Sequence, residues 1–257
     1  MVFRRLMAAL GAGVEVDTVL ANKDVRPGEL LRGVVHFRGG KSDYKVEGIV
    51  IDLTAVVEVE SGDSEYKTSY SFQRTQVAGA FQLAAGEQHQ HPFEVPIPWE
   101  TPISAVGGYP LHGMKLGVHT ELALAGALDK SDLDPLYVSP LPAQDHLLAA
   151  VDRMGFRFKS ADLERGTLYG STMPFFQEIE YYAGGQWRRH FNELELTFIA
   201  GPRQMDVILE ADKKGGLLTS GHDAYNRFTV RYDDPPQAAE AALQRGLEAM
   251  ARRRGWF

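Results

Sequence analysis

The sequence predicts an all-β protein made of two β-sandwich domains. Three observations lead to this prediction. One long segment, residues 46–60, alternates between apolar and polar residues, shorter runs repeat the pattern between glycine and proline turns, and a second series of such runs follows an acidic, proline-bearing stretch. Period-two alternation is typical of strands that place one face on a core and the other in water.

The clearest strand is VEGIVIDLTAVVEVE, residues 46–60, in which every second residue from Ile49 to Val59 is apolar. A strand with two different faces belongs in an antiparallel sheet, because a parallel strand is usually apolar on both. Further strands are expected at residues 14–20, 31–37, 69–77, 91–97 and 116–124, with turns at RPGE, RGGK, AAGE and PIPWETP between them. These runs predict an N-terminal sandwich over residues 1–128.

The stretch ALDKSDLDPLYVSPLP, residues 127–142, contains three aspartates, a density that suggests a calcium loop. An EF-hand needs a ligand at position 5, glycine at 6 and glutamate at 12. A loop that starts at Asp129 has Leu133, Asp134 and Pro140 there, and a start at Asp132 fails as well. Aspartates also cap turns, and an Asp-Pro pair disfavours helix. We therefore predict an inter-domain linker over residues 129–142. Its expected hinge residues are Asp129, Asp132, Asp134 and Pro135.

The second domain is expected over residues 143–257, as a β-sandwich with a C-terminal helix. It begins with AQDHLLAAVDRMG, residues 143–155, whose apolar spacing and final glycine predict a helix. Strands are expected at residues 155–158, 163–168, 175–182, 192–198, 205–211 and 227–232. The Ala- and Leu-rich tail predicts a closing helix over residues 237–253, with arginines at its C-terminal end, where the helix dipole favours cations.

Composition narrows the functional classes. Hydrophobic residues at 44% and charged residues at 24% are typical of a soluble globular protein, and no apolar run is long enough to span a membrane. A net charge of −7 argues against nucleic-acid binding. With no cysteine, the chain has no disulfide, thiolate zinc site or thiol nucleophile, which fits the cytoplasm.

Candidate chemical sites are few. His89 and His91, in HQHP, are two residues apart and would project from the same side of a strand, which makes them a weak candidate for a metal pair. Two ligands alone constrain little, so we favour histidines exposed at a strand edge. The acids of FFQEIEYY and NELEL alternate with apolar residues, which is the pattern of a solvated strand face. With no catalytic motif, we expect no enzyme activity and no cofactor.

Both ends of the chain combine basic and apolar residues. Phe3, Arg4 and Arg5 lie in a short basic amphipathic segment, and the tail contains Arg252, Arg253, Arg254 and Trp256. Such segments either contact a partner or an anionic membrane surface, or cover sheet edges and the seam between domains. Because these helices are short, we favour the alternative in which they cover sheet edges and the seam between domains.

Several motifs, taken in order, resemble one bacterial family. They are GAGVEVDTVLANKDVRPGELLRGVVHFRGG, EGIVIDL, HPFEVPIPWETPI, LDKSDLDPLYVSP, GFRFKSADLE, MPFFQEIEYY, NELELTFI and LEADKKGG. Together they resemble the bacterial sporulation-control protein family of the stage-zero M type, from about residue 6 to 232. The resemblance implies an arrestin-like fold, a regulatory role and no known catalysis. The phosphate-sensing elements of eukaryotic arrestins have no residue-by-residue match here.

These observations favour a non-catalytic cytoplasmic regulator or scaffold that acts through an unidentified protein partner. Two alternatives belong to other classes. One is a peripheral membrane scaffold that uses the terminal helices, with weak contact to the membrane surface. The other is a metal-dependent or carbohydrate-active β-sandwich protein.

Overall fold

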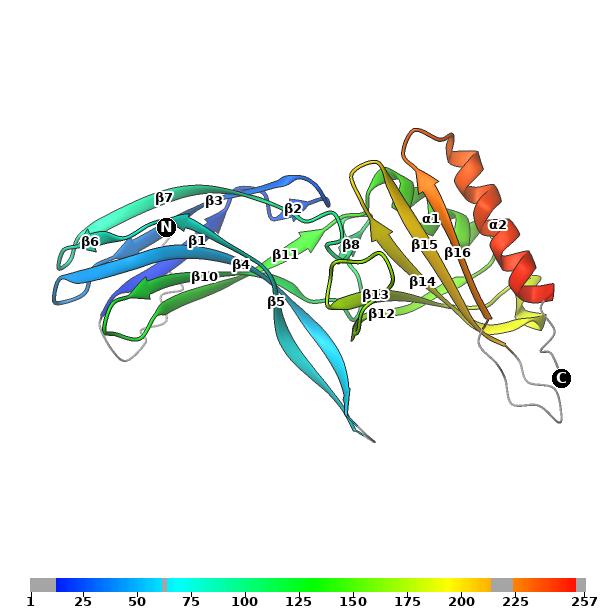
Figure 1. Ribbon diagram of the computed structural model, residues 1–257, viewed down its shortest axis with the longest axis horizontal. Helices are drawn as coiled ribbons and strands as arrows, with labels where there is room; N and C mark the ends of the chain where they lie inside the picture. The colour runs from blue at the N-terminus through cyan, green and yellow to red at the C-terminus, as the bar shows by residue number, and fades with distance from the viewer. Residues whose placement is uncertain (1–12, 62–63, 214–223, 253–257) are drawn as a thin grey trace. The chain divides into compact units, whose positions relative to one another are not determined.

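The structure, a computed structural model, describes residues 13–61, 64–213 and 224–252 (Figure 1). The chain divides into two compact units. Unit 1 comprises Met1–Val56, Ser69–Pro98 and Lys115–Tyr137, and unit 2 comprises Val57–Thr68, Trp99–Met114 and Val138–Phe257.

Unit 1 is a β-sandwich of two antiparallel sheets. The smaller sheet has the order β1–β3–β7, with β1 at Glu15–Leu20, β3 at Leu30–Arg38 and β7 at Gln88–Pro96. The larger sheet has the order β4–β10–β11–β2, and β5 and β6 also pair with β4. Its strands are β2 (Asp24–Val25), β4 (Tyr44–Ser61), β5 (Ser64–Ala78), β6 (Phe81–Leu83), β10 (Leu116–Leu124) and β11 (Lys130–Val138). The parts of β4 and β5 within residues 57–68 belong to unit 2.

The alternation of apolar and polar residues along β4 buries one face of the strand, as predicted. Ile49, Ile51, Leu53 and Ala55 are all at most 2% exposed, so this parity lies in the core of the sandwich. On the smaller sheet, Val35 and Phe37 of β3 are buried in the same way, while His36 and Arg38 project from the opposite face. The core therefore fixes which side chains each strand presents to solvent.

In unit 2, an antiparallel sheet is packed against two helices. The sheet order is β12–β13–β14–β15–β16, with strands at Arg157–Arg165, Phe175–Tyr182, Phe191–Ala200, Gln204–Lys213 and Ala224–Arg231. The helices are α1 (Pro142–Arg153) and α2 (Pro236–Arg252), and smaller elements are β8 (Ala105–Val106), β9 (Tyr109–Pro110) and the 3₁₀ helix η1 (Trp187–Arg189). No helix among the described residues is both long and apolar enough to cross a membrane.

The two predicted helices that fall within the described residues are present, for the expected reasons. Helix α1 starts with Pro142 in its first turn, and the side chain of Gln144 accepts a hydrogen bond from the Leu141 N–H at 2.8 Å. It ends before Gly155, which has a φ of +96° that only glycine adopts easily. Helix α2 buries Leu243 and Leu247. The short amphipathic helix expected at the N-terminus lies outside the described residues.

The structure corrects the expected linker. Residues 130–138 form strand β11, paired with β10 over seven residues, instead of an irregular connection. The boundary between units falls after Tyr137, and the segments at 57–68 and 99–114 cluster with unit 2 although the sequence placed them in the first sandwich. Local alternation cannot reveal this, because it reports which face of a strand is buried and not which unit buries it.

Another correction concerns β12. The sequence predicted two short strands, at residues 155–158 and 163–168, where the structure has one strand from Arg157 to Arg165. Its register with β13 shifts between Phe158 and Ser160. A bulge of this kind inserts one residue and reverses the parity, so the alternation is interrupted although the strand continues.

Candidate functional site

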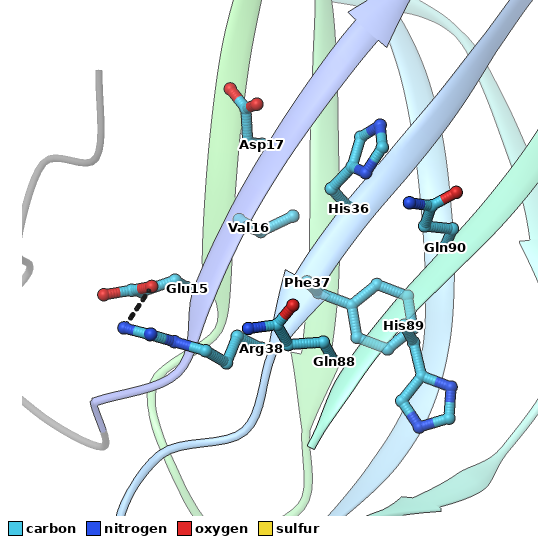
Figure 2. Close-up of a pocket in the computed structure, with 9 residues that line it drawn as sticks. All are labelled: Glu15, Val16, Asp17, His36, Phe37, Arg38, Gln88, His89 and Gln90. Atoms are coloured by element: carbon cyan, nitrogen blue, oxygen red, sulfur yellow. Dashed lines mark ion pairs between the residues drawn. The ribbon is translucent and has the colours of Figure 1, made fainter. Parts of the chain in front are cut away.

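A hollow of about 310 Å³ lies on the outer face of the β1–β3–β7 sheet (Figure 2). Three consecutive residues of each strand line it, namely 15–17 of β1, 36–38 of β3 and 88–90 of β7. Side chains alternate between the two faces of a strand, so the middle residue of each set projects toward the core. These middle residues, Val16, Phe37 and His89, are aligned in the register, and their backbone forms the floor.

The first and third residues of each set form two polar rows on either side of this floor (Figure 2). Glu15, Arg38 and Gln88 are aligned across the three strands as one row. The second row consists of Asp17, His36 and Gln90, aligned in the same way. Rows two residues apart along a strand are separated by roughly 7 Å. We call this hollow, with its floor and two rows, the trough.

The two rows differ in how their charges are satisfied. In the first row, Arg38 Nη2 lies 2.8 Å from Glu15 Oε2, and this ion pair neutralises both groups (Figure 2). In the second row, burial raises the pKa of Asp17 above its usual value of 3.8, the charge of Asp132 raises it further, and His36 lowers it. The ionised Asp17 carboxylate is therefore poorly compensated. The charges of Glu15, Arg38 and Asp17 add up to one net negative charge.

The aspartates predicted to form a hinge belong to unit 1. Asp129, beside β11, accepts a hydrogen bond from the Leu124 N–H at 2.9 Å, and Asp132 accepts one from the Thr18 N–H at 2.8 Å. Asp134 and Pro135 lie within β11, opposite Val118 and Gly117 of β10. Asp129 therefore fixes the β10–β11 turn and Asp132 joins β11 to the edge strand β1, so the hinge assignment is not supported by their positions.

The two histidines proposed as a weak metal pair, His89 and His91, each contact different groups. His91 Nε2 lies 2.9 Å from the carbonyl oxygen of Val77. The ring of His89 stacks on Phe37 with centroids 5.4 Å apart, and its Nε2 lies 2.9 Å from Glu87 Oε1. Both rings are half-buried on the core-facing side of β7, whereas the sequence predicted exposed histidines. In the part of the chain that the structure describes, no group of three or more potential ligands is placed to hold a metal ion.

Most of the terminal residues considered for partner or membrane contact lie outside the described residues, namely Phe3, Arg4, Arg5, Arg253, Arg254 and Trp256. Arg252 is described and exposed, and its Nη2 lies 2.8 Å from Glu248 Oε2. It lines a second hollow, of about 280 Å³, together with Arg189 and His190 of the segment around η1. Arg252 thus lines the same hollow as Arg189, which is distant in the sequence.

A row of carboxylates on unit 2 differs from the solvated face that the sequence suggested. Asp162 of β12 is opposite Glu178 of β13, and Glu180, Glu195 and Glu210 are aligned across β13, β14 and β15. We call these five residues the carboxylate face. All are half-buried, although their alternation with apolar residues is as predicted.

The carboxylate face holds protons near neutral pH. Burial, with the charges of Glu195, Asp162 and other acids, raises the pKa of Glu178 to about 8. Burial and a hydrogen bond with Glu180 raise the pKa of Asp162. At Glu180 burial acts in the same direction, but hydrogen bonds from Lys159 and others outweigh it and lower the pKa. Lys159 Nζ lies 2.5 Å from Glu180 and 2.7 Å from Glu193, which raises the lysine pKa. Sequence alternation showed the acids but gave no measure of their burial.

Comparison with known proteins agrees with this architecture. The family model described as "SpoOM protein" matches residues 3–215. A "Sporulation-control protein spo0M" from Bacillus subtilis (strain 168) is 33% identical over 253 residues, covering 96% of each chain. The crystal structure of Spo0M from Bacillus subtilis covers 93% of this chain and 99% of its own, at 27% identity and a TM-score of 0.82. The predicted all-β, arrestin-like fold is confirmed.

Proposed function

This chain belongs to the SpoOM family of sporulation-control proteins and has a regulatory role, and we propose that it exerts this role in the cytoplasm by binding another protein. In this proposal the protein is a scaffold or regulator and not an enzyme. The family relationship supports the regulatory part. The trough supports the binding part.

The trough is the observation that carries the proposal. It is open to solvent, and two rows of side chains on a rigid three-stranded sheet surround it. Its carboxylates, imidazole, guanidinium and amides offer hydrogen-bond donors and acceptors at fixed positions. Preorganised polar groups of this kind give specificity in protein recognition at a small cost in conformational entropy.

The proposal can be tested by crosslinking in the cells that produce the protein. A photo-crosslinking amino acid at Gln90, in the trough, should give a discrete adduct with one protein. Glu94 provides a matched control position, since it lies on the same strand and the same outer face but outside the trough. No adduct at Gln90, or the same adducts at both positions, would contradict binding through the trough.

A second candidate function, contact with an anionic membrane surface, is favoured by one observation. Arg189 and Arg252 line the same hollow in unit 2 although they are far apart in the sequence. Because Glu248 offsets the charge of Arg252, the positive excess is small, and we favour the protein partner. Co-sedimentation with phosphatidylserine vesicles, compared with neutral phosphatidylcholine vesicles, separates the two. Binding that requires the anionic lipid and falls when Arg189 and Arg252 are both replaced by alanine would support membrane contact.

A further inference from the structure

We propose that the trough binds an arginine side chain presented by the partner protein, with the guanidinium paired to Asp17. This inference rests on the proposed function, because it names the chemistry that the partner must offer. It follows from the charge, the shape and the hydrogen-bonding groups of the trough.

The charge of the trough favours a cation. Arg38 is already paired with Glu15, which leaves Asp17 as the carboxylate without a full counter-charge. The carboxylate of Asp132 lies behind it, held by the Thr18 N–H, and adds to the negative potential. A partly buried negative charge attracts a cation more strongly than a fully hydrated one, because water screens it less. A bound cation would therefore neutralise the negative charge of Asp17.

The shape of the trough favours a flat group. Its floor is formed by backbone at Val16, Phe37 and His89, whose strands are joined by hydrogen bonds within the sheet. Those bonds point along the sheet between strands, so a group above the floor meets the faces of peptide planes. The two side-chain rows stand roughly 7 Å apart, which admits a planar group lying between them. A guanidinium is planar and weakly hydrated, and it stacks on flat surfaces.

The remaining groups distinguish arginine from lysine. A guanidinium presents five N–H donors in a rigid fork, so it can pair with both oxygens of Asp17 and still donate to a neighbouring acceptor. Gln90, at the other end of the same row with His36 of β3 between it and Asp17, supplies an amide oxygen as that acceptor for the far side of the guanidinium. A lysine ammonium is a compact point charge that needs strong hydration, and it would use this arrangement less fully.

The test uses the full chain and three small probes. N-acetyl-arginine amide, N-acetyl-lysine amide and N-acetyl-citrulline amide are titrated into ¹⁵N-labelled protein, and binding is followed by backbone amide shifts in two-dimensional NMR. Citrulline has the shape of arginine without its charge. We expect the arginine probe to shift amides at 15–17, 36–38 and 88–90, with a dissociation constant of about ten millimolar, because an exposed ion pair alone is too weak for the millimolar range and the guanidinium hydrogen bonds add to it. Lysine should bind several-fold more weakly, and citrulline about tenfold more weakly.

Two variants and one control locate the site. Asp17→Asn should weaken the arginine probe about tenfold, and Gln90→Ala, at an exposed position, about threefold. Glu94→Gln removes an exposed acid of the same sheet, one that pairs with Arg32 at 2.6 Å, and should leave the affinity unchanged. Equal binding of arginine and citrulline, lysine binding as tight as arginine, an unchanged affinity in Asp17→Asn, or shifts outside the trough would each overturn the inference.

The outcomes also separate this inference from the proposed function. If crosslinking at Gln90 captures a partner but the arginine probe does not bind, the trough is a docking surface for other chemistry and only the inference fails. If the arginine probe binds as expected but no protein is captured, the charge argument holds and the protein-binding function fails.

Discussion

Replacing Glu178 with glutamine should stabilise unit 2 at alkaline pH and leave its stability almost unchanged in acid. Glu178 is half-buried on β13, opposite Asp162, and burial together with nearby carboxylates raises its pKa from 4.5 to about 8. The folded state therefore keeps this carboxyl protonated where the unfolded chain has already lost the proton. Since the folded state binds more protons, stability falls as the pH rises from about 4.5 to about 8.

The size of the effect follows from the pKa difference. One pKa unit corresponds to about 1.4 kcal/mol, so full expression of the difference between 4.5 and about 8 would cost about 5 kcal/mol. Solvent still reaches this half-buried carboxyl and screens its charge, which reduces the expected cost to about 2–3 kcal/mol. Glutamine has the same shape and no charge, so Glu178→Gln should recover this amount at pH 8.5.

Urea unfolding followed by tryptophan fluorescence measures the effect in the appropriate unit, because Trp99 and Trp187 both lie in unit 2. At pH 8.5 the midpoint of Glu178→Gln should exceed that of the wild type by about 1 M or more, for an m-value of about 2 kcal/mol per molar urea. At pH 5 the two midpoints should nearly coincide. Asp234→Asn removes an exposed acid of the same unit and serves as the control. A midpoint difference that is the same at both pH values, or a less stable variant at pH 8.5, would refute the reasoning.

Four further substitutions test the packing, one of them as a matched control. Asp132→Ala removes the acceptor of the Thr18 N–H and should cost about 1–2 kcal/mol, with faster hydrogen exchange at the Thr18 amide; unchanged exchange would contradict the assigned contact. Gly113→Ala should prevent stable packing or lower the melting temperature sharply, because its Cβ would lie 1.9 Å from a carbonyl oxygen of β12 at a φ of +95°. Gly126→Ala, with a φ of +71° but open space around it, should cost only about 1 kcal/mol, and equal losses would argue against the clash. Gln177→Leu leaves two buried backbone groups without partners and should cost about 3 kcal/mol in urea unfolding; a loss below 1 kcal/mol would argue against that role.

The sequence predicted the strands well because alternation is a local signal. Phe175–Tyr182 was expected as a strand with these same bounds, and its buried parity, from Phe175 to Tyr181, is the apolar one apart from Gln177. Gln177 is buried because its amide bonds the N–H and carbonyl of Ile103, at 2.9 and 2.7 Å. The hydrogen-bonding groups of this polar core residue find their partners in a segment 74 residues away, and no local sequence pattern can reveal that segment.

The trough could not be predicted from the sequence for a related reason. Glu15 and Asp17 are visible as polar residues on one parity of β1, but a surface hollow needs the register with β3 and β7. A shift of one residue in β3 would bring Val35 and Phe37 to the outer face in place of His36 and Arg38 and remove the polar rows from that strand. Register across three strands is decided by the core of the sandwich, which the sequence indicates only one strand at a time.

The aspartate-rich stretch connects these observations. Its pattern suggested a flexible linker because aspartate and proline disfavour regular structure, yet β11 forms and Asp132 uses its carboxylate on the edge of β1. An edge strand leaves N–H groups free to pair with another chain, and a side-chain acceptor on one of them protects that edge. The same carboxylate raises the pKa of Asp17 in the trough. One residue thus holds the edge strand of the sandwich and adds negative charge beside the proposed site. A neutral acceptor at position 132 would retain the first effect and lose the second.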